Sequence, residues 1–172
     1  MGNEAESEGD VLLLRLTSEP ERAGQTLHGE VLGRPRYPTR DRRVAPQAPG
    51  VYFVFRADEI LYVGSSGHGK ATDSKGRLRR GLRRRLLMEF TRTRLSPIRQ
   101  GIAKELGRPG YKPRTKAEKD RVLEGRIRDQ VQQLAYAFVL TSSSEIASQL
   151  ERLSIKLLWP TFNKRFKAAH PV

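Results

Sequence analysis

The sequence predicts a mixed α/β domain of the α+β type, in which helices flank a small three-stranded antiparallel sheet. Two runs of β-branched and aromatic residues, 51–56 and 60–65, are separated only by a short turn, which is typical of a β-hairpin. A third run of this kind covers 134–140, and apolar residues elsewhere recur at helical spacing. The predicted order is β-β-α-α-α-β-α without internal repeats, and helices packed on one sheet suit this length.

Side chains alternate between the two faces of the predicted hairpin. Tyr52 and Val54 should therefore lie on one face, with Phe53 and Phe55 on the other. By the same rule Tyr62 and its neighbour Leu61 should face opposite ways. Whether Tyr52 and Tyr62 share a face then depends on the register of the hairpin.

The first two predicted helices follow the hairpin. One is expected over about 76–90, where apolar residues recur at every fourth position. Gly81 interrupts this pattern and leaves a start near Leu82 open. The next helix is expected over 96–106, because its first residue is a serine with the chemistry of an N-cap and a proline follows in the first turn.

The last two predicted helices carry capping-box patterns. One is expected over 115–130, where Thr115 is followed three residues later by Glu118. The final helix should open at Ser142, which also precedes a glutamate by three residues. The Trp-Pro pair at 159–160 should end it.

The chain before the hairpin gives weaker signals. We expect a partly disordered N-terminal extension over 1–48, followed by a single domain over 49–168. Residues 1–9 are polar and acidic, which is typical of disorder. The apolar run 11–16 fits either a short strand or a buried helical turn. Residues 17–48, rich in Pro, Arg and Gly, predict an extended arm with one short element around 27–32.

Composition excludes several classes of protein. The 172 residues suit one domain with a modest core, and the absence of cysteine excludes disulfides and thiolate metal sites. No apolar stretch approaches the ~20 residues of a membrane span, and the acidic N-terminus is unlike a signal peptide. No nucleotide-binding P-loop or His-Glu-x-x-His zinc motif occurs. We therefore expect a soluble, cytoplasmic protein without a membrane partner.

Positive charge is concentrated in one segment. Between Lys75 and Arg128, 19 Lys and Arg face 5 Asp and Glu, which accounts for the whole net charge of +14. Such a localised field predicts a polyanionic partner, most simply nucleic acid. Arginine outnumbers lysine 24 to 9, which suits bidentate phosphate binding, although a GC-rich genome would give the same ratio. The alternative is a solvated charged face on an ordinary helical protein.

Four short motifs occur in a fixed order within the predicted domain. They are Gly50-Val51-Tyr52, Tyr62-Val63-Gly64, the arginine-rich run from Leu82 to Phe90, and Leu150-Glu151 followed by Pro160-Thr161-Phe162-Asn163. In these motifs the chain resembles the GIY-YIG nucleases, over about 50–165. Each motif alone is weak, but four in this order and on matching element types are specific. The segment after Gly64 is longer here than in compact members of that family.

The resemblance implies a metal-dependent endonuclease that hydrolyses phosphodiester bonds in DNA. Hydrolysis needs an activated water and neutralisation of the phosphate charge. Glu151, a hard oxygen ligand, suits Mg²⁺ or Mn²⁺. Tyr52 is the expected general base, and neighbouring cations or a metal-bound water network would have to lower its pKa from ~10. Tyr62 would hold the water or the phosphate, or share the role of base. Arg85 would bind the scissile phosphate.

The remaining site predictions concern residues that contact the nucleic acid and one residue that supports the active site structurally. Asn163 should tie the chain after the last helix to the wall of the active site. Arg77 and Arg79 remain alternatives to Arg85, and Glu89 stands where relatives often have a histidine. The predicted nucleic-acid contacts are Gly64, His68, Lys70, Arg77, Arg79, Arg80, Arg83 and Arg84.

Two other functions remain open from the sequence. One is a non-catalytic module that binds DNA or RNA on the same fold, and the other is a small interaction protein with surface arginines. The recognised site, a restriction or repair role, and the oligomeric state are not specified by these residues. A bacterial protein of this kind would associate with the nucleoid.

Overall fold

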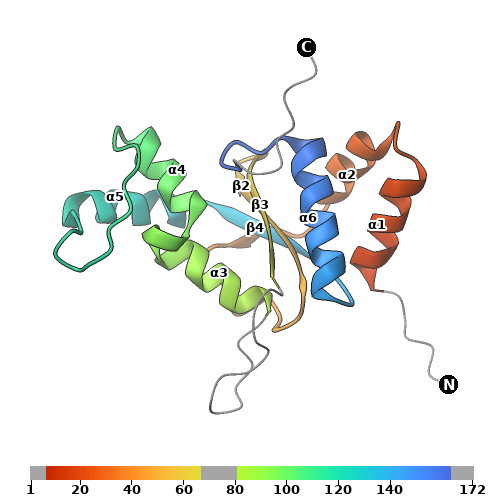
Figure 1. Ribbon diagram of the computed structural model, residues 1–172, viewed down its shortest axis with the longest axis horizontal. Coiled ribbons are helices and arrows are strands. Elements are labelled where there is room, and N and C mark those ends of the chain that lie inside the picture. The colour runs from red at the N-terminus through yellow and green to blue at the C-terminus, as the bar shows by residue number, and fades with distance from the viewer. Residues whose placement is uncertain (1–6, 67–80, 164–172) are drawn as a thin grey trace.

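The structure is a computed structural model that describes residues 7–66 and 81–163. These residues form a mixed α+β fold with six α-helices and a four-stranded antiparallel sheet. The elements are α1 (Glu8–Ser18), α2 (Ala23–Leu32), β1 (Tyr37–Pro38), β2 (Gly50–Arg56), β3 (Glu59–Ser66), α3 (Leu82–Thr91), a 3₁₀ turn (Thr93–Leu95), α4 (Pro97–Glu105), α5 (Arg121–Gln132), β4 (Ala135–Leu140) and α6 (Ser144–Leu158). Figure 1 shows three layers, with α3, α4 and α5 on one side of the sheet and α6, α1 and α2 on the other.

The sheet has the strand order β1-β4-β2-β3, and all of its pairs are antiparallel. The hairpin and the third predicted strand are confirmed as β2, β3 and β4. The prediction of three strands is corrected by β1, a two-residue strand that pairs Tyr37 with Tyr136 and Pro38 with Ala135. Two residues are too few to show an alternating pattern, and the stacking of Tyr37 on Phe138 (ring centroids 5.8 Å apart) depends on the folded chain.

The two faces of the sheet belong to separate hydrophobic clusters. Tyr52 and Val54 pack with residues of α3, α4 and α5. Val51, Phe53 and Phe55 pack with residues of α1, α2 and α6, which confirms the predicted alternation in β2.

The prediction that Leu61 and Tyr62 face opposite ways is wrong. Both belong to the cluster that also contains Tyr52. The register changes between Val54, which pairs with Tyr62, and Phe55, which pairs with Ile60. Leu61 is therefore the extra residue of a β-bulge, and a bulge breaks strict alternation.

The N-terminal segment is more folded than predicted. The helical alternative for the run 11–16 is confirmed within α1, and the short element predicted around 27–32 lies in α2, but these helices replace much of the predicted extended arm. Helix α1 buries Leu12 and Leu16, and α2 buries Leu27 and Val31. Both pairs are four residues apart, but two such helices have little stability until they cover the sheet and α6. Residues 1–6, part of the predicted disordered stretch, lie outside the described residues.

The start of one helix differs from prediction by several residues. Thr115 and Glu118 make the reciprocal bonds of a capping box: the amide of Glu118 donates to Thr115 Oγ1 (3.2 Å), and the amide of Arg114 donates to Glu118 Oε2 (2.8 Å). No helix follows directly, because 115–119 offers no large apolar residue to bury. Helix α5 instead begins after Asp120, which caps the amide of Leu123 (3.0 Å).

The other helix ends agree more closely. Helix α6 is capped by Ser143, not Ser142, through the amide of Ile146 (3.2 Å). Ser96 caps α4 as predicted. Helix α3 starts at Leu82, while 76–80 lie outside the described residues. Within the described part of the chain, no helix is both long and apolar enough to cross a membrane.

Candidate active site

Tyr52 and Tyr62 lie side by side on the face of the sheet that α3 covers. Tyr52 pairs directly with Gly64, and Val54 pairs with Tyr62, so the two tyrosines are diagonal neighbours. Their ring centroids are 6.0 Å apart. A Cβ on Gly64 would overlap the Tyr52 hydroxyl. Only glycine, which has no side chain, therefore leaves room for the Tyr52 ring at this position. The space beside Gly64, a predicted nucleic-acid contact, is therefore filled by the Tyr52 ring of the paired strand.

Helix α3 brings Arg85 and Glu89 against the tyrosines. The two residues are one turn apart, and Arg85 Nη2 lies 2.6 Å from Glu89 Oε1. Arg85 Nε also donates to the Tyr52 hydroxyl (3.3 Å), and this hydroxyl donates to Glu89 Oε1 (3.1 Å). The Arg85 side chain is 33% exposed and the Glu89 side chain is 0% exposed.

Burial controls the protonation of this group. Tyr52 is fully buried, and burial, followed by the charge of Glu89, holds its pKa well above 10 in spite of Arg85. Burial raises the pKa of Tyr62 for the same reasons. Burial also raises the pKa of Glu89, and the charge of Arg85 partly offsets this. Arg85 alone therefore does not lower the pKa of Tyr52, because burial and a neighbouring carboxylate outweigh one arginine. That a metal-bound water network lowers this pKa stays a prediction.

Glu151 approaches the same region from the other layer. It is half-buried on α6, and the Ser65 hydroxyl donates to Glu151 Oε2 (2.5 Å). Ser65 pairs with Val51, so it lies on the α6 face of the edge strand β3. After burial and Glu89, the charge of Glu151 also raises the pKa of Tyr62, so the carboxylate acts on this phenol across the edge.

The donor set around Glu151 suits a cation that keeps most of its waters. Over 7–66 and 81–163, no three His, Asp or Glu side chains gather closely enough to hold a metal ion among themselves. One carboxylate with water and substrate oxygens is a common Mg²⁺ environment, whereas structural zinc needs more protein ligands. Glu151 with the adjacent Ser65 hydroxyl therefore fits Mg²⁺ or Mn²⁺.

The segment after α6 closes the edge of the sheet next to these residues. Asn163 Oδ1 accepts from the amide of Val63 (2.8 Å), and Asn163 Nδ2 donates to the Val63 carbonyl (2.8 Å). The amide of Phe162 donates to the Leu61 carbonyl (2.7 Å). Asn163 thus ties the chain to β3 beside Tyr62 and satisfies backbone groups that an edge strand leaves open.

The residues predicted to contact nucleic acid differ in their surroundings, and only some of them lie within the described residues. Arg84 is exposed on α3. Arg83 binds the protein's own backbone, with Nε donating to the Ala45 carbonyl (2.9 Å) and Nη2 to the Arg43 carbonyl (2.9 Å). Five further predicted contacts lie outside the described residues, namely His68, Lys70, Arg77, Arg79 and Arg80. Among the arginines of α3, Arg85 is the one whose side chain contacts Tyr52.

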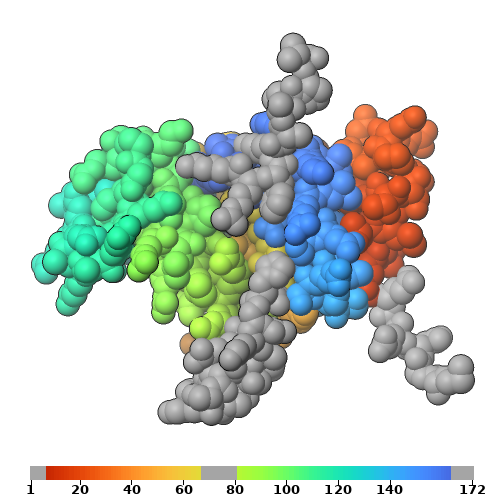
Figure 2. Space-filling view, in the orientation of Figure 1, coloured from red at the N-terminus to blue at the C-terminus, as the bar shows by residue number. Residues whose placement is uncertain are grey.

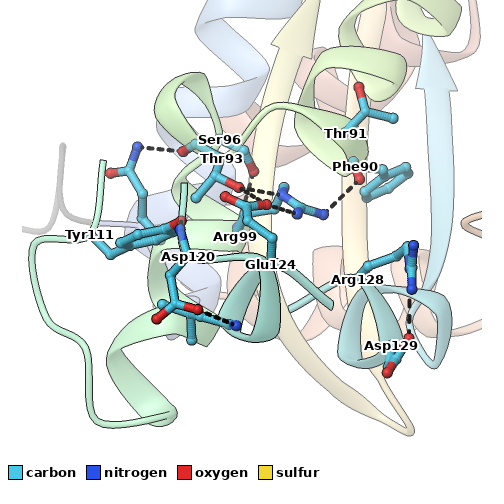
Figure 3. A network of polar contacts seen from close by, with 12 residues as sticks. Phe90, Thr91, Thr93, Ser96, Arg99, Tyr111, Asp120, Glu124, Arg128 and Asp129 are labelled. Carbon is cyan, nitrogen blue, oxygen red and sulfur yellow. Dashed lines mark hydrogen bonds and ion pairs between the residues drawn. The ribbon is translucent and has the colours of Figure 1, made fainter. Parts of the chain in front are cut away.

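A second buried polar cluster joins the helices of this layer (Figure 3). Arg99 on α4 donates to Thr93 Oγ1 (2.8 Å), to the Phe90 carbonyl (3.1 Å) and to Glu124 Oε2 (2.7 Å). These contacts link the end of α3, the 3₁₀ turn and α5 through one guanidinium. The cluster therefore fixes the orientation of the three helices relative to one another.

Sequence reasoning did not assign roles to Glu89 or Ser65. Glu89 carries a usable signal, because it follows Arg85 by four residues and stands beside Phe90 in the apolar stripe of α3. Ser65 lies where strand alternation predicts the α6 face, but its contact with Glu151 depends on how α6 packs. Comparisons of the chain with models of protein families, with curated proteins and with solved structures found no match.

Proposed function

We propose that this protein is a metal-dependent endonuclease of the GIY-YIG type that hydrolyses phosphodiester bonds in DNA. One observation carries the proposal: two phenols and a guanidinium meet on one face of the hairpin, and Glu151 of the adjacent helix is bound to Ser65 of the same edge strand. Hydrolysis of a phosphodiester needs a proton acceptor and positive charge at the phosphate. Arg85 supplies positive charge, and a tyrosine would supply the acceptor once a bound divalent ion lowers its pKa.

The proposed roles follow from exposure and charge. Arg85 is partly exposed, so its guanidinium can bind the phosphate and stabilise the charge that develops there. A tyrosine would take the proton of the attacking water after a divalent ion at Glu151, together with Arg85, has lowered the pKa that burial raises in the ion-free protein. Tyr62 retains 6% exposure and is the phenol on which Glu151 acts, whereas Tyr52 is fully buried. The water therefore meets Tyr62 first, and Tyr52 shares the role through the contacts around Arg85.

Glu151 would hold Mg²⁺ or Mn²⁺, assisted by Ser65. When bound, such an ion supplies positive charge to the phosphate and lowers the pKa of a coordinated water. The half-buried Glu151 carboxylate, already oriented by the Ser65 hydroxyl, needs little rearrangement to bind a cation.

The distribution of charge supports DNA as the partner. Residues 81–132 contain 15 Lys and Arg against 6 Asp and Glu, whereas 7–34 contain 3 against 5. The basic side chains exposed in this layer are Arg83, Arg84, Arg92, Arg94, Lys104, Arg108, Lys112, Arg114, Lys116, Lys119, Arg121, Arg126 and Arg128. Figure 2 shows α3, α4 and α5 together at the end of the molecule opposite α1. A one-sided basic surface favours binding to a nucleic-acid backbone. Such a nuclease would act in the cytoplasm, at the nucleoid in a bacterium.

A direct test is cleavage by the wild-type protein. Supercoiled plasmid, branched DNA and RNA are each incubated with Mg²⁺, with Mn²⁺ or with EDTA. We expect cutting of DNA with either ion and none with EDTA. Binding without cutting of any substrate would reject the nuclease and support a non-catalytic nucleic-acid-binding module, a second candidate that the complete burial of Tyr52 favours.

A further inference from the structure

We propose that Glu89 is a positioning residue that holds the Arg85 guanidinium in the orientation needed to bind the scissile phosphate. The inference rests on the proposed nuclease function and assigns a role to a residue that the proposed chemistry does not use. Its basis is the geometry of three side chains, Tyr52, Arg85 and Glu89.

These three side chains form a closed ring of contacts. Glu89 Oε1 lies 2.6 Å from Arg85 Nη2 and accepts from the Tyr52 hydroxyl at 3.1 Å. Arg85 Nε completes the ring through the same hydroxyl at 3.3 Å. Because Nε and Nη2 are both engaged, the plane of the guanidinium is held at two points. A single contact would leave the group free to rotate.

The two partners of the Arg85–Glu89 ion pair differ in their exposure to solvent. The Glu89 side chain is wholly buried, whereas one third of the Arg85 side chain is exposed. The carboxylate thus holds the guanidinium from the protein side and leaves its outer part open to a ligand. Tyr62 is more exposed than Tyr52 and lies beside it. A phosphate bound to Arg85 would therefore also lie near the Tyr62 phenol.

Stability alone does not explain a carboxylate at this position. Glu89 lies next to Phe90 in the buried stripe of α3, and its side chain is 0% exposed. Burying an ion pair costs desolvation, and an apolar pair of similar volume is often equally stable or more so. A role in orienting Arg85 accounts for a group whose burial is otherwise unfavourable.

A double-mutant cycle tests whether Glu89 acts through Arg85. The single-turnover rate of plasmid cleavage at saturating protein is measured for Arg85→Met, Glu89→Leu and the double variant. We expect Arg85→Met to slow cleavage about 100-fold. Glu89→Leu should slow it roughly 10- to 100-fold, as outer-shell substitutions do. The double variant should be no slower than Arg85→Met alone, because Glu89 then has nothing to orient. The Kd for DNA should change little, since many exposed basic residues bind the backbone.

Two further variants separate orientation from general damage. Glu89→Gln keeps an acceptor oxygen for both Arg85 and Tyr52, so we expect it to retain most of the cleavage rate. Glu105→Leu breaks an exposed ion pair with Arg56 (2.7 Å) and should cleave like the wild type. Additive effects of Arg85→Met and Glu89→Leu would overturn the proposal, because two independent residues multiply their losses.

A second measurement does not depend on cleavage. The Arg85 Nε–H bond to Tyr52 should slow exchange of this proton with water, which ¹⁵N NMR detects as a persistent side-chain signal. We expect the signal in the wild type and in Glu89→Gln, and its loss in Glu89→Leu. A signal that persists in Glu89→Leu would overturn the positioning role. A wild type that cuts no nucleic acid would reject the nuclease, and the NMR result would still decide whether Glu89 orients Arg85.

Discussion

At the scale of residues, Tyr52 and Tyr62 should keep their phenolic protons near pH 10 in the folded protein without a bound divalent ion. Burial, before any charge, raises the pKa of both Tyr52 and Tyr62 above the ordinary value of about 10. The chain has five tyrosines, so their ionisation can be followed by absorbance. We expect Tyr52→Phe and Tyr62→Phe to leave the amplitude gained near pH 10 unchanged. A loss of amplitude there in either variant would show that the phenol ionises normally.

The raised pKa values of Tyr52 and Tyr62 also make the stability of the protein depend on pH. Above about pH 10 the unfolded chain loses these phenolic protons while the folded chain retains them. Their contribution to stability is therefore complete below about pH 10 and is lost as the pH rises through the folded pKa values. The free energy of unfolding should fall in that alkaline range, and Tyr52→Phe should reduce the slope.

Gly64 is predicted to be intolerant of a side chain. Its Cβ would overlap the Tyr52 hydroxyl and lie 2.5 Å from Tyr52 Cζ, so the ring would have to move. We expect Gly64→Ala to lower the free energy of unfolding by about 1–3 kcal/mol. The matched control is Gly29→Ala in α2, where nothing lies within 4 Å and alanine should stabilise by about 0.5–1 kcal/mol. Equal effects of both substitutions in urea unfolding would contradict this account of Gly64.

At the scale of elements, Arg99 determines how α3, α4 and α5 pack together. Its removal leaves Glu124 without its ion-pair partner in a mostly buried position, with a side chain only 20% exposed. We expect Arg99→Met to lower the free energy of unfolding by about 3 kcal/mol. Arg108→Met, which breaks the exposed pair with Asp120, should cost less than about 1 kcal/mol. Comparable losses in urea unfolding would show that the buried cluster has no special importance.

The elements that the sequence predicts well are those whose signals are local. The β2–β3 hairpin has its alternation and its turn within one short stretch, and α4 has its cap and proline. Helices α1 and α2 and the strand β1 are different, because short segments gain most of their stability from the sheet and α6. The false helix start at Thr115 shows the converse, since capping bonds form there without an apolar face to bury.

The same distinction applies to the candidate site. The prediction of Tyr52, Tyr62 and Arg85 rests on motifs within single elements, and the structure brings these three side chains together. The link between Ser65 and Glu151 joins two elements that are far apart in the chain. The raised pKa of Tyr52 likewise depends on tertiary burial, which no spacing in the sequence specifies, and on Glu89, whose spacing indicates the pair with Arg85 but not the contact with Tyr52.

At the scale of the whole molecule, the positive charge of the α3–α5 layer should make DNA binding strongly dependent on salt. Each phosphate contact contributes about one to the slope of log K against log salt concentration. We expect Arg84→Ala, on the exposed face of α3, to reduce this slope by about one. Arg15→Ala, which breaks an exposed pair with Glu30 on the opposite layer, should leave it unchanged. Fluorescence anisotropy at several salt concentrations measures both, and a flat dependence for the wild type would contradict a backbone-binding surface.

The central claim is that two tyrosines, Arg85 and Glu151 form one hydrolytic centre. The most direct measurement is plasmid cleavage by Glu151→Gln in Mg²⁺, beside Glu145→Gln, which alters an exposed glutamate on the same helix. The account predicts that Glu151→Gln binds DNA like the wild type but cuts it at least about 100 times more slowly, whereas Glu145→Gln cuts normally. Wild-type cutting by Glu151→Gln, or equal losses in both variants, would contradict it.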